Sequence, residues 1–255
     1  MRLYALVLIL ALFTAACGGG GGSETAEEAP AAAPAVESTA MGTGSITGTI
    51  SFMGTAPERA RLRMNADCDD QRDPDDPALS EDVVINGTAL QHAFVYVSAG
   101  LPADYSYAPP AELAVLDQIG CMYVPHVMGV QVGQTIRIEN TDPFQHNIHP
   151  TPEVNRGFNE STPNAESFLE KEFLIPEMGI SVKCDVHAWM QAFLHVMNHP
   201  YHATTDADGN FTIRGLPAGE YTVTVRHESL GEQEGQVMVT DDAAAEFDAA
   251  FSAGA

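Results

Sequence analysis

Short stretches of alternating apolar and polar residues recur along the chain after residue 43, and they predict β-strands. Residues 44–52 (GSITGTISF) alternate from one residue to the next, which is the period of a strand with one buried face. Further strands are predicted at residues 83–85, 89–98, 113–116, 122–124, 127–132, 135–139, 146–149, 167–174, 178–184 and 191–197. About eight of them fall within fewer than ninety residues, so this region is expected to form a sandwich or barrel.

The C-terminal part of the chain repeats the pattern with clear turn signals. Residues 206–210 (DADGN) predict a hairpin turn between polar and apolar segments, and strands are expected at residues 211–213, 221–225 and 236–239. The tail from Asp241 is rich in alanine and acidic residues, and it is expected to fray or to form an edge strand. Loops are expected at residues 67–77, 101–110 and 156–165.

The first 43 residues do not follow this pattern. Arg2, an apolar run over residues 3–13 and the small residues 14–16 are typical of an export signal, and the run is too short to span a bilayer as a helix. Residues 18–43 consist mainly of Gly, Ala, Glu, Pro, Ser and Thr. Such a segment cannot bury enough apolar surface to offset the entropy of ordering it, so a disordered linker is expected.

The small residues directly before Cys17 resemble the lipobox of bacterial lipoproteins. That resemblance implies a signal peptide over residues 1–16 and a lipidated linker over residues 17–43. It also implies a place in the bacterial cell envelope, on the periplasmic side of a membrane. An ordinary secretory signal is the alternative, and both place the chain in an oxidising compartment.

The chain is strongly acidic. Its 255 residues include 11 Lys and Arg against 35 Asp and Glu, a formal net charge of −24. Nucleic acid is excluded as a partner on this ground, because binding it requires a basic surface. The charge would suit a basic protein partner, and it would equally serve solubility or adaptation to salt, since the acidic residues are scattered.

Four cysteines are present, and they fall into different settings. Cys17 ends the export signal and Cys184 lies in the candidate metal site described below. For Cys68 and Cys121, a disulfide is the default expectation in an exported protein. Two buried thiols are the alternative.

Cys184, His187 and Met190 place a thiol, an imidazole and a thioether within seven residues. These are soft or borderline ligands that suit copper, whereas the alternative is that they only pack a core. A second imidazole could come from His146 or His149. Side chains three residues apart on a strand point to opposite faces, so both cannot enter one interior site.

Residues 113–198 resemble a cupredoxin, a blue-copper protein of the amicyanin and plastocyanin type. The resemblance rests on the hairpin over residues 130–140, on Pro143-Phe144-Gln145-His146-Asn147 and on Cys184-x2-His187-x2-Met190. It implies one type 1 copper, with His146, Cys184 and His187 as strong ligands and Met190 as a weak axial ligand. It also implies that Asn147 braces the ligand loop through hydrogen bonds.

The resemblance leaves some residues in other roles. Asp185 replaces the small hydroxyl residue usual after the ligand cysteine, which would alter the hydrogen bonding of the loop. His149 is expected in a surface or supporting role and His126 in a structural one, with an additional metal site or a supporting role beside the metal ligands as the alternative for both. Trp189 and its neighbours are expected to surround His187 with an apolar patch that gives an electron a short route to a partner. The remaining histidines are expected to be ordinary, with a weak second metal site as an alternative for three of them: His195, His199 and His202.

A second resemblance, carried mainly by residues 205–225 (TDADGNFTIRGLPAGEYTVTV), is to the carboxypeptidase regulatory-like, transthyretin-type β-sandwich. It implies a discontinuous sandwich over residues 44–110 and 203–250, with the cupredoxin domain, residues 111–202, inserted in it. A disulfide between Cys68 and Cys121 would then link the two sandwiches. The expected fold class is all-β, a cupredoxin Greek-key β-sandwich with a second small β-sandwich, preceded by a disordered linker.

The function that these expectations favour is a membrane-tethered electron carrier rather than an enzyme. No nucleophile–base arrangement or phosphate-binding loop stands out in the sequence. A redox protein such as a c-type cytochrome, or a membrane electron-transfer complex, is the expected partner. The alternatives are a lipoprotein that binds or delivers copper and a structural adaptor subunit of a membrane complex.

Overall fold

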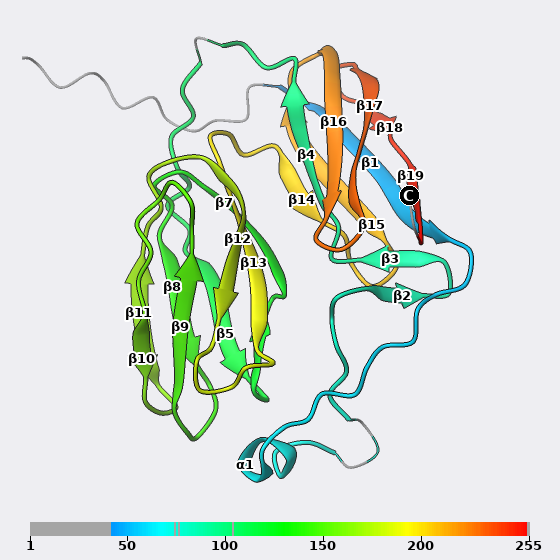
Figure 1. Ribbon diagram of the computed structural model, residues 1–255. Helices are drawn as coiled ribbons and strands as arrows, with labels where there is room; N and C mark the ends of the chain where they lie inside the picture. Colours follow the sequence, from blue (N-terminus) through cyan, green and yellow to red (C-terminus); the bar gives the residue numbers. More distant parts are fainter. Residues whose placement is uncertain (1–41, 74, 76, 104, 254–255) are drawn as a thin grey trace, which may run out of the picture. The chain divides into compact units, whose positions relative to one another are not determined.

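The computed structural model describes residues 42–253 except residues 74, 76 and 104, and the regular secondary structure of this part is almost entirely β-strand (Figure 1). The expected all-β fold class is confirmed. The export signal, Cys17 and nearly all of the linker lie outside the described residues. Among the described residues, no helix has both the length and the apolar character needed to cross a membrane.

Two sheets formed by strands β5 to β13 pack against each other, and we call this unit the central sandwich. One sheet has the order β10-β9-β12-β13-β7 and the other the order β11-β8-β5-β6. The bounds are β5 (Ala114–Ile119), β6 (Met122–Val124), β7 (Val127–Gln131), β8 (Ile136–Asn140), β9 (His146–Thr151), β10 (Glu160–Thr162), β11 (Ser167–Lys171), β12 (Glu177–Lys183) and β13 (Gln191–Met197).

The core of the central sandwich explains why apolar and polar residues alternate along these strands. Leu116, Ile138, Ile148 and Val182 come from both sheets and form one buried apolar cluster. Most neighbouring strands are antiparallel, but β13 pairs with β7 and β5 pairs with β8 in parallel. Burial of apolar side chains from the facing sheets is the main stabilising contribution to such a unit.

The remaining strands form a second unit, the flanking sandwich. Its sheets are β15-β1-β3-β2, in which β18 and β19 also pair with β1, and β14-β4-β16-β17. The bounds are β1 (Gly44–Met53), β2 (Val84–Asn86), β3 (Ala89–Gln91), β4 (Phe94–Ala99), β14 (His202–Thr204), β15 (Asn210–Leu216), β16 (Gly219–His227), β17 (Gly231–Val239), β18 (Ala244–Glu246) and β19 (Ala249–Ser252). Strands β18 and β19 run parallel to β1, so the tail forms edge pairings.

Several expectations for the elements were wrong in part, of which three bear on the fold near the site. The strand expected over residues 89–98 is broken into β3 and β4, because His92 has a φ of 67° and interrupts the ladder. The loops expected over residues 156–165 and 67–77 contain β10 and the helix α1 (Ala66–Asp69). Each of these two elements is only three or four residues long, which is too short for a hydrophobic period to predict it.

Cys68 and Cys121 are joined in a disulfide, with their Cα atoms 5.8 Å apart. Cys68 lies in α1, and Cys121 lies at the turn between β5 and β6. Both sulfurs belong to the buried core of the central sandwich. The segment between β1 and β2 therefore packs its short helix against the central sandwich, next to the site described below.

Candidate metal centre

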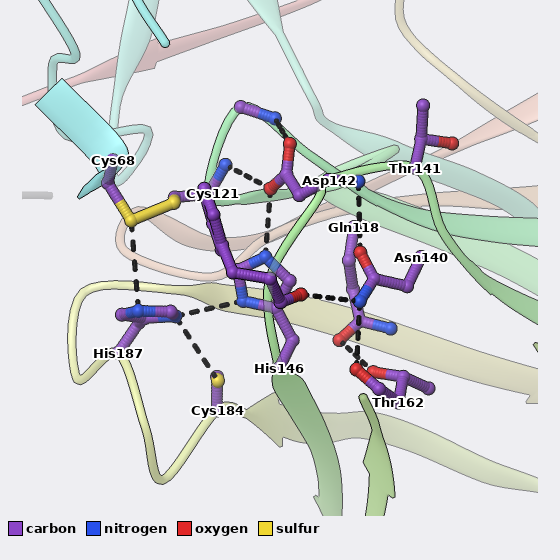
Figure 2. Close-up of polar contacts among 12 residues, drawn as sticks. Cys68, Gln118, Cys121, Asn140, Thr141, Asp142, His146, Thr162, Cys184 and His187 are labelled. Carbon is purple, nitrogen blue, oxygen red and sulfur yellow. Dashed lines mark hydrogen bonds and ion pairs between the residues drawn. A yellow bond between two sulfur atoms is a disulfide. The ribbon is translucent and has the colours of Figure 1, made fainter. Parts of the chain in front are cut away.

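His146, Cys184 and His187 converge in the central sandwich (Figure 2). His146 begins β9, Cys184 follows the end of β12, and His187 lies in the loop between β12 and β13. The Nδ1 atoms of the two histidines are 2.8 Å apart, and the Cys184 sulfur is 4.0 Å from Nδ1 of His187. All three residues are buried, with exposed fractions of 0%, 2% and 4% in chain order.

The loop over residues 184–190 is short and closed by its own backbone. The amide of Met190 donates to the carbonyl of His187 at 2.9 Å, and the amide of Cys184 donates to the carbonyl of Met190 at 3.4 Å. This tight return brings Cys184 and His187 to one side of the loop. The Met190 side chain is buried in the same core cluster as the Cys184 sulfur.

Asn147 holds the beginning of this loop. Its Oδ1 atom accepts hydrogen bonds from the amides of Asp185 at 2.7 Å and Val186 at 3.2 Å, and from the thiol of Cys184 at 3.3 Å. Its Nδ2 donates to Asn159 at 2.7 Å. Because Asn147 is the neighbour of His146, one short segment supplies a candidate ligand and fixes the loop that carries the other two.

Asp142 is a further residue of the site, and the sequence did not predict it. Its Oδ2 atom lies 2.8 Å from Nε2 of His146 and also accepts the amide of Cys121 at 2.8 Å. Its Oδ1 atom accepts the amide of Gly120 at 2.7 Å. A carboxylate on the outer nitrogen of a histidine fixes the ring and leaves the lone pair on the inner nitrogen, here Nδ1. The feature of the sequence that could have indicated this role is a carboxylate four residues before His146.

The charges of the site favour a thiolate. Burial alone raises the pKa of the Cys184 thiol, but hydrogen bonds from His146 and from backbone amides lower it below its ordinary value. Burial lowers the pKa of His146, yet Asp142 and Cys184 raise it above the ordinary value. For His187, burial and the charge of His146 both lower the pKa. The thiolate is the form of cysteine that binds metals.

The Trp189 ring lies beside His187 as expected, at 5.0 Å between ring centroids, but the outer edge of the imidazole is buried and does not reach the surface. Its Nε2 atom lies 3.3 Å from Nδ2 of Asn65 and 3.7 Å from the sulfur of Cys68. Trp189, which was expected to frame the patch, donates its Nε1–H to the carbonyl of Cys121 at 3.0 Å. The disulfide holds α1 over the imidazole, and this long-range contact has no signal in the local sequence.

His149 and Asp185 form a separate pair outside the buried site. Nδ1 of His149 lies 3.1 Å from the Asp185 carboxylate, which also accepts from Nδ2 of Asn159 at 2.6 Å. Hydrogen bonds from His149 and Asn159 lower the pKa of Asp185. His149 thus points away from Cys184, as the two-residue strand period requires.

The other histidines lie elsewhere. His126 is buried, with Nδ1 3.1 Å from the carbonyl of Gln191 and Nε2 2.9 Å from Glu228. None of the groups of metal-binding type found among the described residues includes His195, His199 or His202. His195 instead accepts the amide of Gly179 and stacks on Phe94 at 4.2 Å between ring centroids.

The donor set of the buried site fits a soft or borderline metal ion. One sulfur and two imidazole nitrogens converge, Asp142 orients the ring of His146, and all three residues are buried. Thiolate together with imidazole suits copper, and zinc accepts the same ligand types.

Comparisons with known proteins give one family match and several similar structures. The model of the carboxypeptidase regulatory-like domain matches residues 191–252, from β13 to β19. No curated protein matches the chain.

Similar solved structures include copper proteins. A purple cupredoxin from Nitrosopumilus maritimus is 21% identical, over 32% of this chain and 98% of that one, with a TM-score of 0.29. A Cu(I) form of an amicyanin mutant is 19% identical, over 40% and 97%, with a TM-score of 0.30. The Cu-containing nitrite reductase from Thermus scotoductus SA-01 is 18% identical, over 39% of this chain, with a TM-score of 0.29. The similarity spans only 25% of the nitrite reductase chain.

Proposed function

We propose that this chain is an electron carrier that holds one type 1 copper between His146, Cys184 and His187, with Met190 as a weak axial ligand. The observation that carries the proposal is the convergence of the two Nδ1 atoms and the Cys184 sulfur within 4.8 Å, in a buried site. Copper bound there would supply reversible one-electron chemistry.

The protein's own part in this function is to keep the ligands still. Asn147 fixes the loop amides, and Asp142 fixes the ring of His146. Rigid ligands lower the cost of reorganisation when the charge of the ion changes. Burial keeps water and small oxidants away from the sulfur, which favours transfer of an electron over ligand exchange.

Burial also favours an electron carrier over a copper-delivery protein. An ion that must be handed over needs ligands within reach of an acceptor, whereas all three candidate ligands are at most 4% exposed. The closed site therefore supports retention of the metal through many redox cycles.

The setting that we propose is the periplasmic face of a bacterial membrane. The residues before Cys17 support lipid attachment, and the linker up to residue 43 would let the folded part reach a partner. A c-type cytochrome or a membrane electron-transfer complex would be a suitable partner. A basic docking surface on that partner would match the net charge of −24.

The test is a potentiometric titration of the copper-loaded chain in the presence of a chelator. We expect reversible uptake and release of one electron per chain, while the copper stays bound in both oxidation states. Loss of the copper to the chelator after a single reduction would contradict the proposal and favour copper delivery.

A further inference from the structure

The Cys68–Cys121 disulfide lies directly against the outer nitrogen of His187. Figure 2 shows His187 between this disulfide and Cys184. Both sulfurs and a ring nitrogen of His187 lie within 4.8 Å of one another, and all three residues are buried. Three atoms of metal-ligand type thus converge at a second point, on the opposite edge of the ring from the proposed copper site.

In the disulfide these sulfurs are poor ligands, because a metal binds the thiolate. A dithiol reductant changes this by exchange: it closes its own disulfide while Cys68 and Cys121 become two thiols, so two electrons and two protons pass to the protein. A metal ion that then binds both sulfurs displaces the two thiol protons.

We propose that reduction of the Cys68–Cys121 disulfide opens a second metal site, for monovalent copper, with both sulfurs as strong ligands and Nε2 of His187 as the third. Two thiolates form a soft pair that selects Cu(I). Structural zinc almost always takes four ligands. Asp142, which lies beside Cys121, is already held by His146 and the amides of residues 120 and 121.

Contacts other than the sulfur–sulfur bond keep the two cysteines together after reduction. Arg72, which follows α1, donates from Nη1 to the carbonyl of Gly120 at 2.9 Å. The amide of Cys68 donates to Asn65 at 3.0 Å, and the carbonyl of Cys121 accepts from Trp189. The thiols would therefore remain neighbours, which a pair of metal ligands requires.

The shared histidine makes the two sites competitors. A neutral imidazole has one nitrogen with a free lone pair. His187 can offer Nδ1 to the site with Cys184 or Nε2 to the site with Cys68 and Cys121, but not both while its ring remains neutral. The state of the disulfide would then decide which site takes copper.

The inference does not rest on the proposed electron carrier, since the second site uses neither His146 nor Cys184. It is therefore tested in the full chain carrying Cys184→Ser, which lacks the thiolate of the first site. The variant is prepared with the disulfide intact and after anaerobic treatment with dithiothreitol, and free thiols are counted in both samples. Cu(I) binding is measured by competition with a chromogenic Cu(I) chelator.

We expect one Cu(I) per chain in the reduced sample and none in the oxidised sample. A variant with Cys68→Ser and Cys121→Ser added should bind none in either state. Adding His187→Ala instead should weaken binding about tenfold or more, and X-ray absorption should report two sulfur neighbours in the Cys184→Ser protein. Three results would overturn the inference: thiols that stay absent from the folded protein under excess dithiothreitol, two thiols without Cu(I) binding, or equal binding with the disulfide intact.

Discussion

Asp142 is the residue on which the orientation of His146 depends. Its carboxylate lies 2.8 Å from Nε2 of the ring and accepts hydrogen bonds from the amides of residues 120 and 121. Burial raises the pKa of this carboxyl, but the contact with His146 and the two amides lower it below its ordinary value. A charged carboxylate therefore keeps the Nδ1 lone pair of His146 directed at the site.

Asp142→Asn tests this role, because the amide keeps the size of the side chain and loses its charge. We expect copper affinity to fall about 10- to 100-fold, the usual effect of losing a partner behind a metal-binding histidine. Competition with a copper chelator measures the change. Asp117→Asn is the matched control, since Asp117 accepts from Thr141 at the same end of the sheet and does not touch His146. Equal losses in both variants would contradict the role of Asp142.

At this scale the sequence predicted residue types better than contacts. Strand periodicity places His146 and His149 on opposite faces, and the resemblance to cupredoxins selected His146. His146 is fully buried, whereas His149 pairs with Asp185 at the surface. Strand periodicity could not predict Asp142 behind His146 or Cys68 beside His187, because both contacts depend on how distant turns meet. The spacing of Cys184 and His187 indicated a soft donor set. That these residues lie next to His146 is shown only by the folded structure.

Among the elements, long alternating strands were predicted well and short ones were not. β1, β8 and β13 lie close to their expected positions, because one buried face imposes a strict two-residue pattern on them. β10 and β14 have three residues each and exist through pairing with β9 and β4. Such strands are fixed by tertiary pairing, which a local pattern does not contain.

Glu177 is the polar anchor at the start of β12. Its carboxylate accepts hydrogen bonds from the backbone amides of Glu153, Val154 and Asn155, and from the Asn155 side chain at 2.9 Å. Burial alone would raise the pKa of Glu177, but these hydrogen bonds lower it below its ordinary value. The segment over residues 153–155 is thereby tied to the strand that leads to Cys184.

Glu177→Gln should therefore change how stability depends on acid. A carboxyl with a lowered pKa in the folded state contributes stability above the pKa of the unfolded chain and loses it as the pH falls through the folded value. We expect the variant to have a lower melting temperature than the parent at pH 7, with a gap that shrinks as the pH drops below about 4.3. The exposed Glu112 supplies the control, Glu112→Gln. A gap that is constant with pH would rule out this role of the charge.

At the scale of the whole molecule, the described residues form two all-β sandwiches that share one chain. The strands of the flanking sandwich come from both sides of the central one in the sequence. The nested order was implied by the resemblance of residues 205–225, together with strands before the central sandwich, to a carboxypeptidase regulatory-like sandwich. The contact of α1 and the disulfide with His187 could not be predicted from the sequence, because it joins residues 53 positions apart or more.

The proposed lipid anchor gives a prediction for the full chain in its native compartment. Cys17→Ser removes the sulfur that would carry the lipid and should move the protein from the membrane fraction to the soluble periplasmic fraction. Detergent-phase partitioning of both forms, with Ser23→Ala as the control in the same linker, measures the shift. Recovery of the parent chain in the soluble fraction would contradict the anchor.

The central claim is that a single copper sits against the sulfur of Cys184. The most direct measurement is the visible absorption spectrum and copper content of the disulfide-intact chain after addition of one equivalent of Cu(II), with Cys184→Ser beside it. We predict one copper per parent chain and an intense visible band from sulfur-to-copper charge transfer, with no such band in the variant. A colourless parent, or one whose band survives Cys184→Ser, would contradict the account.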